Sequence, residues 1–188
     1  MEKSAVVKED PYSKPAMSLL NRLARSLWGF FYITLFRPSP RPFHVWRSML
    51  LRLFGAKLGS GCHIYPKSKI WAPWNLICED VVAIADGAII YNPDTITIMS
   101  HATISQDAYL CGASHDYDDP AFSMISRPIT IEAYAWICAR SSVLPGVTIK
   151  EGAVLALGSV TSKDLEPWSV YAGMPAKKIK DRKQHELK

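Results

Sequence analysis

The sequence lacks several features that would define a function at once. Its four cysteines form no CxxC pair, and it has no glycine-rich loop of the kind that cradles nucleotide phosphates. A zinc site and a P-loop are therefore not predicted. The longest apolar stretch, residues 27–36 with Gly29 and Thr34 as interruptions, has about half of the roughly 20 residues that a transmembrane helix needs. A membrane-spanning helix is not predicted either.

The beginning of the chain also lacks the pattern of a signal peptide, so the cytoplasm is the expected compartment. Thiols stay reduced there, and the cysteines at positions 62, 78, 111 and 138 are then small core or wall residues. Peripheral attachment to the inner membrane is compatible with this location.

Negatively charged residues are the scarcer ones, because the chain has 22 Lys and Arg residues but 17 Asp and Glu residues, which gives a formal charge of +5. Much of the basic excess lies near the two ends of the chain. It has two interpretations: attraction to phosphates on a cofactor or a membrane surface, or ordinary solvated charge. A nucleic-acid partner is not expected.

Residues 1–57 are predicted to form an N-terminal unit, in which a loose arm over residues 1–14 precedes two amphipathic helices. The first helix covers about residues 16–36 and ends before a group of three prolines. The second covers about residues 43–54.

The role of these helices has two interpretations. Residues 16–54 either cap the open end of the next domain or pack between subunits, or they form a peripheral membrane foot. On the second helix, Arg47 and Arg52 are expected on the outer face, away from its apolar residues.

An aliphatic residue recurs about every six positions from Leu58 onward. The series is Leu58, Ile64, Ile70, Cys78, Ile84, Ile90, Ile98, Ile104, Leu110, Ile125, Ile131, Ile137, Val143, Ile149 and Leu155. A period of six fits neither an α-helix nor a plain strand. It fits three short strands per turn of a triangular prism, whose aliphatic residues point inward and stack from coil to coil.

The predicted fold is therefore all-β. A parallel β-helix of about five coils covers residues 58–160, with α-helices before it and a short C-terminal extension, residues 161–188, after it. The steps exceed six residues only after Ile70, Ile90 and Leu110. Each of these follows the third side of a coil, so the insertions, including a long loop over residues 112–124, are expected on one edge, which marks the binding face.

Two sets of motifs carry a resemblance to a known family. The run ITIEAYAWICARSSVLPGVTIKEGAVLALGSVTSKDLEPWSVYAGMPAKKIK resembles the C-terminal half of the hexapeptide-repeat sugar O-acetyltransferases, such as the galactoside, maltose and nodulation-factor acetyltransferases. The motifs LFRPSPRPFHVWR, HIYPKSKIWAPWNL, IIYNPDTITI and SHDYDDPAF are similar to acetyltransferases of colanic acid and exopolysaccharide biosynthesis. This resemblance implies a left-handed β-helix, a homotrimer with active sites in the grooves between subunits, and acetyl-CoA as co-substrate without a metal.

The long loop contains a histidine, His115, that matches the family's catalytic histidine. A neutral imidazole suits the proton transfer from a weakly acidic sugar hydroxyl. By the same resemblance Asn92 contacts or orients the acceptor, with a turn asparagine as its alternative. Asp116 and Asp118 are candidates for binding acceptor hydroxyls or for orienting His115. Trp71 is expected either to stack on a sugar or to pack against the N-terminal helices.

The resemblance also implies a binding path for the cofactor. Its expected residues are Trp136, Ala139, Leu157, Ser162, Lys163, Lys177 and Lys180. The lysines would meet phosphates as point charges, and a backbone N–H near Ala139 would stabilise an oxyanion. A zinc hydratase on the same fold would need several converging histidines, whereas the loop holds one.

Taken together, the sequence predicts an acetyl-CoA-dependent O-acetyltransferase that acts on a sugar hydroxyl, in an exopolysaccharide or lipid-linked saccharide, with His115 as general base. Two alternatives stay open. One is an acetyltransferase of a small non-sugar acceptor, and the other is a non-catalytic β-helix that serves in assembly.

Overall fold

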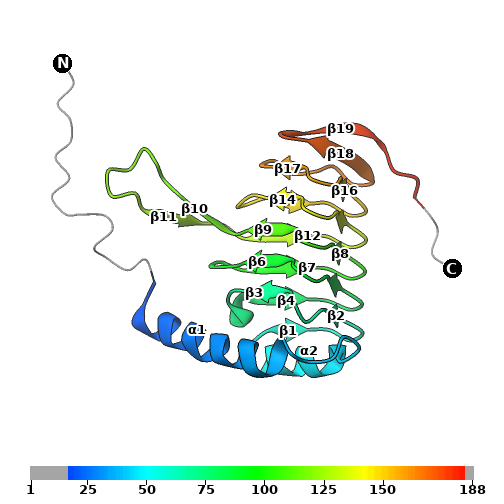
Figure 1. The fold of residues 1–188 in the computed structure, drawn as a ribbon. Helices are drawn as coiled ribbons and strands as arrows, with labels where there is room; N and C mark the ends of the chain where they lie inside the picture. The colour runs from blue at the N-terminus through cyan, green and yellow to red at the C-terminus, as the bar shows by residue number, and fades with distance from the viewer. Residues whose placement is uncertain (1–16, 185–188) are drawn as a thin grey trace, which may run out of the picture.

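The computed structural model describes residues 17–184, and the predicted arm over residues 1–14 lies outside this range. Within it, short parallel strands stack into a triangular prism (Figure 1), with helices across one end and a strand pair at the other. The predicted β-helix with N-terminal helices and a C-terminal extension is thereby confirmed.

In residues 17–184, each of five coils contributes one strand to each of three parallel sheets, here called faces A, B and C in chain order. Face A stacks β1 (Lys57–Leu58), β4 (Leu76–Cys78), β7 (Ile96–Ile98), β12 (Ile129–Ile131) and β15 (Thr148–Ile149). Face B stacks β2 (His63–Ile64), β5 (Ala83–Ile84), β8 (Thr103–Ile104), β13 (Trp136–Ile137) and β16 (Val154–Leu155). Face C stacks β3 (Lys69–Ile70), β6 (Ile89–Tyr91), β9 (Tyr109–Cys111), β14 (Ser142–Val143) and β17 (Val160–Thr161).

The interior of the prism is a ladder of aliphatic side chains. On face B the rungs pair in register from coil to coil and have zero exposure; they are Ile64, Ile84, Ile104, Ile137 and Leu155. Full burial of such a side chain contributes about 1.5–3 kcal/mol. The ladder is therefore the main source of stability, and each coil relies on its neighbours to be covered.

The fourth coil differs from the predicted series. Ile125 lies in a hairpin outside the prism and is partly exposed, so it is not a rung of the ladder. Ile131 opens the coil on face A instead, which places Val143 on face C and gives Thr161 the last position of the fifth coil. The prediction failed here because Ile125, a residue of the insertion, lies by chance six positions before Ile131.

The tight corners require left-handed backbone conformations. Between faces A and B, the third residue after each inward-pointing residue has a positive φ; these residues are Gly61, Val81, His101, Tyr134 and Gly152. This conformation costs a residue with a Cβ atom roughly 1–2 kcal/mol, a cost that glycine avoids. Where His101 and Tyr134 occupy the position, their rings stack with centroids 4.9 Å apart, which offsets part of the cost.

The insertions lie at the corner between faces C and A, here called the seam. It holds the 3₁₀ turn η2 (Pro73–Asn75), residues 91–95, and a hairpin of β10 (Ala113–His115) and β11 (Met124–Ser126). Figure 1 shows the hairpin projecting sideways from the prism. The prediction that the insertions gather on one edge is confirmed, although the third one runs beyond the expected residue 124.

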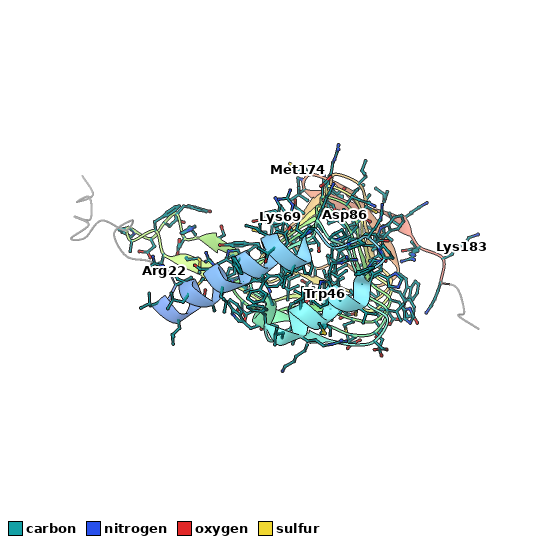
Figure 2. All side chains as sticks on the ribbon, turned by 60° about the horizontal axis from the view of Figure 1, so that its bottom comes forward. Arg22, Trp46, Lys69, Asp86, Met174 and Lys183 are labelled. Atoms are coloured by element: carbon teal, nitrogen blue, oxygen red, sulfur yellow. The ribbon has the colours of Figure 1, made fainter. Side chains whose placement is uncertain are left out.

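The helices close the first coil. α1 (Leu19–Phe31) continues into a π-helical segment, η1 (Tyr32–Phe36), and α2 (His44–Leu53) follows the prolines. Figure 2 shows α1 and α2 lying across the base of the prism. The buried Trp28 joins helix and coil, because its indole Nε1 donates to the carbonyl oxygen of Ile70 at 2.8 Å and its ring packs edge-on against Phe36. These helices therefore cap the prism.

The expectation for Arg47 was wrong, because its side chain is fully buried rather than on the outer face. Its guanidinium donates four hydrogen bonds of 2.6–2.9 Å, to Ser39 Oγ and to the carbonyl oxygens of Pro40, Arg41 and Ile64. Burial lowers the pKa of Arg47 from its ordinary value, and these acceptors compensate for the lost water. The arginine thereby ties the segment between the two helices to the first coil.

The outer sides of α1, η1 and α2 carry many exposed apolar residues, here called the apolar base. They are Leu19, Leu20, Leu23, Leu27, Phe30, Ile33, Val45, Met49 and Leu53. Among the described residues, the helices are all too short or too polar to cross a membrane. Exposed apolar residues in this number are typical of surfaces that bind a partner or a lipid.

The C-terminal extension continues face B. β18 (Ser169–Gly173) pairs parallel with β16, and β19 (Ala176–Asp181) returns antiparallel to β18. Leu165 is buried and pairs with Ile149 on face A, so the extension begins as a partial further coil. The strand pair therefore covers the far end of the ladder.

Replacing Arg47 tests whether this buried cation holds the cap. We expect Arg47→Ala to lower the free energy of unfolding by about 3 kcal/mol, because four buried or half-buried acceptors lose their charged donor. Urea denaturation at equal protein concentration measures the change. Arg37→Ala, which removes an exposed arginine from the same segment, should have little effect. Equal stability of Arg47→Ala and the wild type would contradict this account.

Candidate active site

The hairpin at the seam carries His115 at the end of β10, where it pairs with Met124 of β11. The three registered pairs of the hairpin run from Ala113 opposite Ser126 to His115 opposite Met124. The side chain of His115 is exposed. An exposed imidazole on a paired strand is available to a substrate while its backbone is held in place.

The imidazole of His115 is oriented by the loop of the hairpin. Its Nδ1 lies 2.8 Å from the carbonyl oxygen of Phe122, and the two rings stack with centroids 4.5 Å apart at an angle of 8°. A carbonyl oxygen only accepts hydrogen bonds, so Nδ1 carries the proton in the neutral ring. The free lone pair is then on Nε2, and this tautomer is the one that a general base requires.

Three aspartates shape the loop between the hairpin strands. The backbone N–H of Asp118 donates to Asp116 Oδ1 at 3.1 Å, and the N–H of Ala121 donates to Asp119 Oδ1 at 2.9 Å. Hydrogen bonds from Ser123 and from the backbone of Ala121 lower the pKa of Asp119. Asp116 and Asp118, both predicted to bind the acceptor, therefore lie in the same loop as His115, and Asp116 also stabilises the turn.

Asn92 is held away from this surface. It is fully buried, with its Nδ2 donating to the carbonyl oxygen of Ala72 at 2.7 Å and its Oδ1 accepting from the N–H of Ala72 at 2.9 Å. Both polar atoms of the amide are thus used to join two coils at the seam. This cross-coil role differs from the turn that was the alternative for Asn92, and its contact with the acceptor stays a prediction.

A cavity of about 350 Å³ opens beside His115. It is lined by Met17, Arg22, Arg25, Trp71, Tyr91, His115 and Met124. The guanidinium carbon of Arg25 lies 4.1 Å from the ring centre of Trp71, whose ring meets Tyr91 edge-on at 5.4 Å. Both interpretations of Trp71 therefore have support, since it contacts α1 and also lines the cavity.

The residues predicted to bind the cofactor lie elsewhere on the prism. Ala139 and Leu157 occupy the corner between faces B and C in successive coils, where the N–H of Gly158 donates to the carbonyl oxygen of Ala139 at 3.0 Å. Leu157 is 72% exposed. His115 projects from the opposite end of face C, so a single chain does not place these two residues beside its own histidine.

Trp136, the next of these residues, lies on face B. Its indole Nε1 donates to Ser105 Oγ at 2.8 Å, and its ring lines a second cavity, of about 340 Å³, together with Tyr134 and Arg182. Its side chain is 45% exposed. Trp136 is therefore held in position but offers a flat surface to a ligand.

The remaining candidates follow the fifth coil. Ser162 and Lys163 are exposed at the seam directly after β17, and Lys177 and Lys180 are exposed on β19. The neighbouring Lys178, which was not a candidate, binds Glu166 and Asp181 at 2.8 and 2.9 Å. These carboxylates raise the pKa of Lys178, so its charge is already paired.

Comparisons with known proteins identify the family of this fold. A hexapeptide-repeat-containing acetyltransferase of Vibrio cholerae, solved in complex with acetyl-CoA, superposes with a TM-score of 0.79 over 90% of this chain and 93% of that one, at 27% identity. The galactoside O-acetyltransferase of Escherichia coli is 31% identical over 66% of this chain and 59% of that protein. WcaF of Escherichia coli, named as an acetyltransferase of colanic acid biosynthesis, is 39% identical over 88% of this chain and 91% of its own length.

The chain belongs to the hexapeptide-repeat acetyltransferases. The family predicted from the motifs is therefore confirmed, and with it the class of enzyme. No family model matches the chain. Among the described residues, no group of three or more His, Cys, Asp and Glu side chains could hold a metal ion.

Sequence reasoning missed part of this candidate site. Arg22, Arg25 and Tyr91 were not candidates, although all three line the cavity beside His115. The two arginines belong to a helix far from His115 in the sequence, and their spacing on α1 fits an ordinary solvated face. The available signal was that this helix carries two arginines on one side and exposed apolar residues on the other.

Proposed function

We propose that this enzyme transfers the acetyl group of acetyl-CoA to a sugar hydroxyl, with His115 as the general base. The observation that supports this most is the orientation of the His115 imidazole, whose Nδ1 donates to the carbonyl oxygen of Phe122 and whose Nε2 is left as the acceptor. The acetyl-CoA bound to the Vibrio cholerae relative and the colanic acid biosynthesis named for WcaF support the co-substrate and a saccharide acceptor.

In the proposed reaction, Nε2 of His115 accepts the proton of the sugar hydroxyl while its oxygen attacks the thioester carbonyl. The tetrahedral oxyanion then collapses, the carbon–sulfur bond breaks, and the imidazolium returns its proton to the CoA thiolate. Holding both substrates in place supplies much of the acceleration. Asp116 and Asp118 are proposed to bind acceptor hydroxyls, because they lie in the same loop as the base.

The proposed oxyanion donor is the backbone N–H of Ala139. The neighbouring residues use their own N–H groups within the prism, since Cys138 donates to the carbonyl of Leu155 and Arg140 to that of Gln106. No acceptor among the described residues is recorded for Ala139. A fixed and unused N–H beside a thioester carbonyl would stabilise the oxyanion.

The CoA is proposed to extend along the corner between faces B and C and over the end of the prism. This path would be lined by the residues Trp136, Ala139, Leu157, Ser162, Lys163, Lys177 and Lys180. Because Ala139 and Leu157 lie at a different corner from the hairpin, His115 would act on a cofactor held by another copy of the chain. A cyclic homotrimer brings a seam of one subunit against the neighbouring corner of the next, and we propose that assembly.

Loss of the proposed base should stop the chemistry without unfolding the protein. We expect His115→Ala to lower the turnover number by about 10²–10⁴-fold, the usual contribution of a general base. Release of CoA thiol with a panel of methyl glycosides measures it. His101→Asn removes another exposed imidazole and tolerates the positive φ at that corner, and it should stay active. A His115→Ala enzyme with near-normal turnover would refute the assignment.

Mixed oligomers test whether sites are shared between subunits. We expect His115→Ala and Ala139→Trp each to be inactive, and their co-refolded mixture to recover about a quarter of wild-type activity, since one site in four then combines an intact histidine with an intact corner. Lys67→Trp, at the same corner in the first coil, should stay active alone. A sedimenting monomer, or a mixed trimer without recovered activity, would contradict the shared site.

We also propose that the apolar base attaches the enzyme to an anionic membrane surface. Burial of apolar area contributes about 25 cal/mol per Å², and each arginine near an anionic leaflet adds about 1 kcal/mol. Exposed arginines lie in the same N-terminal segment, at positions 37, 41 and 52. A lipid-linked acceptor would then meet the enzyme at the membrane.

Co-sedimentation with lipid vesicles tests this attachment. We expect the protein to pellet with vesicles that contain phosphatidylglycerol and to be released by high salt. The triple variant Leu20→Gln, Leu27→Gln, Ile33→Gln should stay in solution, while Met174→Gln and Ile179→Gln, which replace exposed apolar residues at the opposite end, should pellet normally. Equal pelleting of all variants, or of none, would leave the helices with their capping role alone.

A further inference from the structure

Two cavities run side by side along α1 and share residues. The first, of about 350 Å³, contains His115, and the second, of about 330 Å³, lies between α1 and the first coil. Both are lined by Arg25 and Trp71. Together they form a groove, here called the α1 groove, that begins at the proposed base and reaches Lys69. Figure 2 shows Arg22 near the start of α1 and Lys69 beside its other end.

The α1 groove is strongly basic. Arg22 and Arg25 line its first part and Lys69 lines its second, while neither cavity has an aspartate or glutamate among its lining residues. The ion pairs recorded for residues 17–184 involve Arg140 and Lys178 on other surfaces, so a carboxylate of the described chain neutralises neither groove arginine. Three cations that no carboxylate of residues 17–184 pairs, in a concave surface, raise the local concentration of anions.

The position of Arg25 is fixed by its neighbours. Its guanidinium carbon lies 4.1 Å from the ring centre of Trp71, and Tyr91 holds this ring by an edge-on contact. A stacked guanidinium offers its flat face to the ring and keeps the N–H groups at its edge free for other partners. Those N–H groups match the two oxygens of a carboxylate or a phosphate.

We propose that the acetyl acceptor is an anionic saccharide, whose carboxylate or phosphate is bound by Arg22 and Arg25 while its hydroxyl faces His115. This inference rests on the proposed sugar acetylation and adds the charge of the acceptor. A uronate carboxylate and a sugar phosphate share the required chemistry. In the carboxylate case the charged group belongs to the acetylated sugar or its neighbour, and in the phosphate case it belongs to the linkage of that sugar to a carrier.

The cations of the α1 groove are separate from those proposed to bind CoA. The cofactor candidates with positive charge lie after the fifth coil, at Lys163, Lys177 and Lys180, whereas Arg22 and Arg25 lie at the base of the prism. The phosphates of CoA would therefore have their own cations. An anion bound beside His115 would also fix the direction in which the acceptor enters, because a single charged group orients a sugar ring that has several similar hydroxyls.

Acceptors matched in ring configuration test the inference. Methyl hexosides, methyl hexuronides and hexose 1-phosphates of gluco, galacto and manno configuration are compared in acetyl transfer. We expect a charged member of a matched set to have a kcat/KM at least about 10-fold above the neutral one, and Arg25→Gln to lower it about 10- to 100-fold. Preference for the uronide or for the phosphate identifies the source of the charge.

The control for this experiment is Arg41→Gln. Arg41 also lies over an aromatic ring, that of Tyr65 at 4.9 Å, but it lines neither cavity of the groove. Its loss should leave both charged and neutral acceptors unchanged. If Arg25→Gln lowers the use of charged and neutral acceptors equally, or raises the KM for acetyl-CoA instead, the inference fails while the proposed acetylation stands.

A binding measurement separates the inference from the proposed reaction. Saturation-transfer NMR with methyl hexuronides and hexose 1-phosphates is recorded on the wild type and on the double variant Arg22→Gln, Arg25→Gln. We expect binding to the wild type that weakens with salt and is lost in the variant. Equal binding by both proteins, or none by the wild type, overturns the inference even if acetyl transfer is not detected. His115-independent transfer would instead overturn the proposed function.

Discussion

The stacking of one inward aliphatic residue on the next is the constraint on which the rest of this structure depends. A strand of two or three residues cannot bury enough surface to persist alone, but in the prism each strand of the three middle coils is bonded to a strand of the coil before and of the coil after it. The registers of Ile84 with Ile64 and with Ile104 leave no freedom to slip. The position of each insertion is set by the point at which the chain leaves the ladder.

Much of the fold follows from this period, and the failures have local physical causes. The aliphatic ladder and the seam are read from the sequence because inward positions tolerate few residue types. Ile125 was misplaced because a strand of the hairpin has the same apolar residues as a coil, and periodicity alone does not separate them. Arg47 was misplaced because an amphipathic pattern treats every arginine as exposed, whereas this one finds carbonyl acceptors contributed by a proline-rich segment.

The candidate site also combines residues that the sequence indicated with residues that only the tertiary structure brings together. His115 became a candidate because it stands in the longest departure from the period and matches a motif, and both signals are local in sequence. The orientation of its ring depends on Phe122, seven residues away across a hairpin, and was not predicted. Arg25 reached the site through the docking of α1, which is decided by tertiary contacts such as that of Trp28 with Ile70. Such contacts leave no periodic trace.

The three corners of the prism differ in whether they tolerate an inserted residue. A single left-handed residue closes each corner between faces A and B, and each corner between faces B and C after the first coil. An added residue there would rotate every later rung out of the interior. At the seam, additional chain simply loops outward and returns in register. Insertions of different length and composition are therefore compatible with one unchanged scaffold. The seam therefore tolerates changes in loop length. Residues that recognise a different acceptor could be introduced there without altering the ladder.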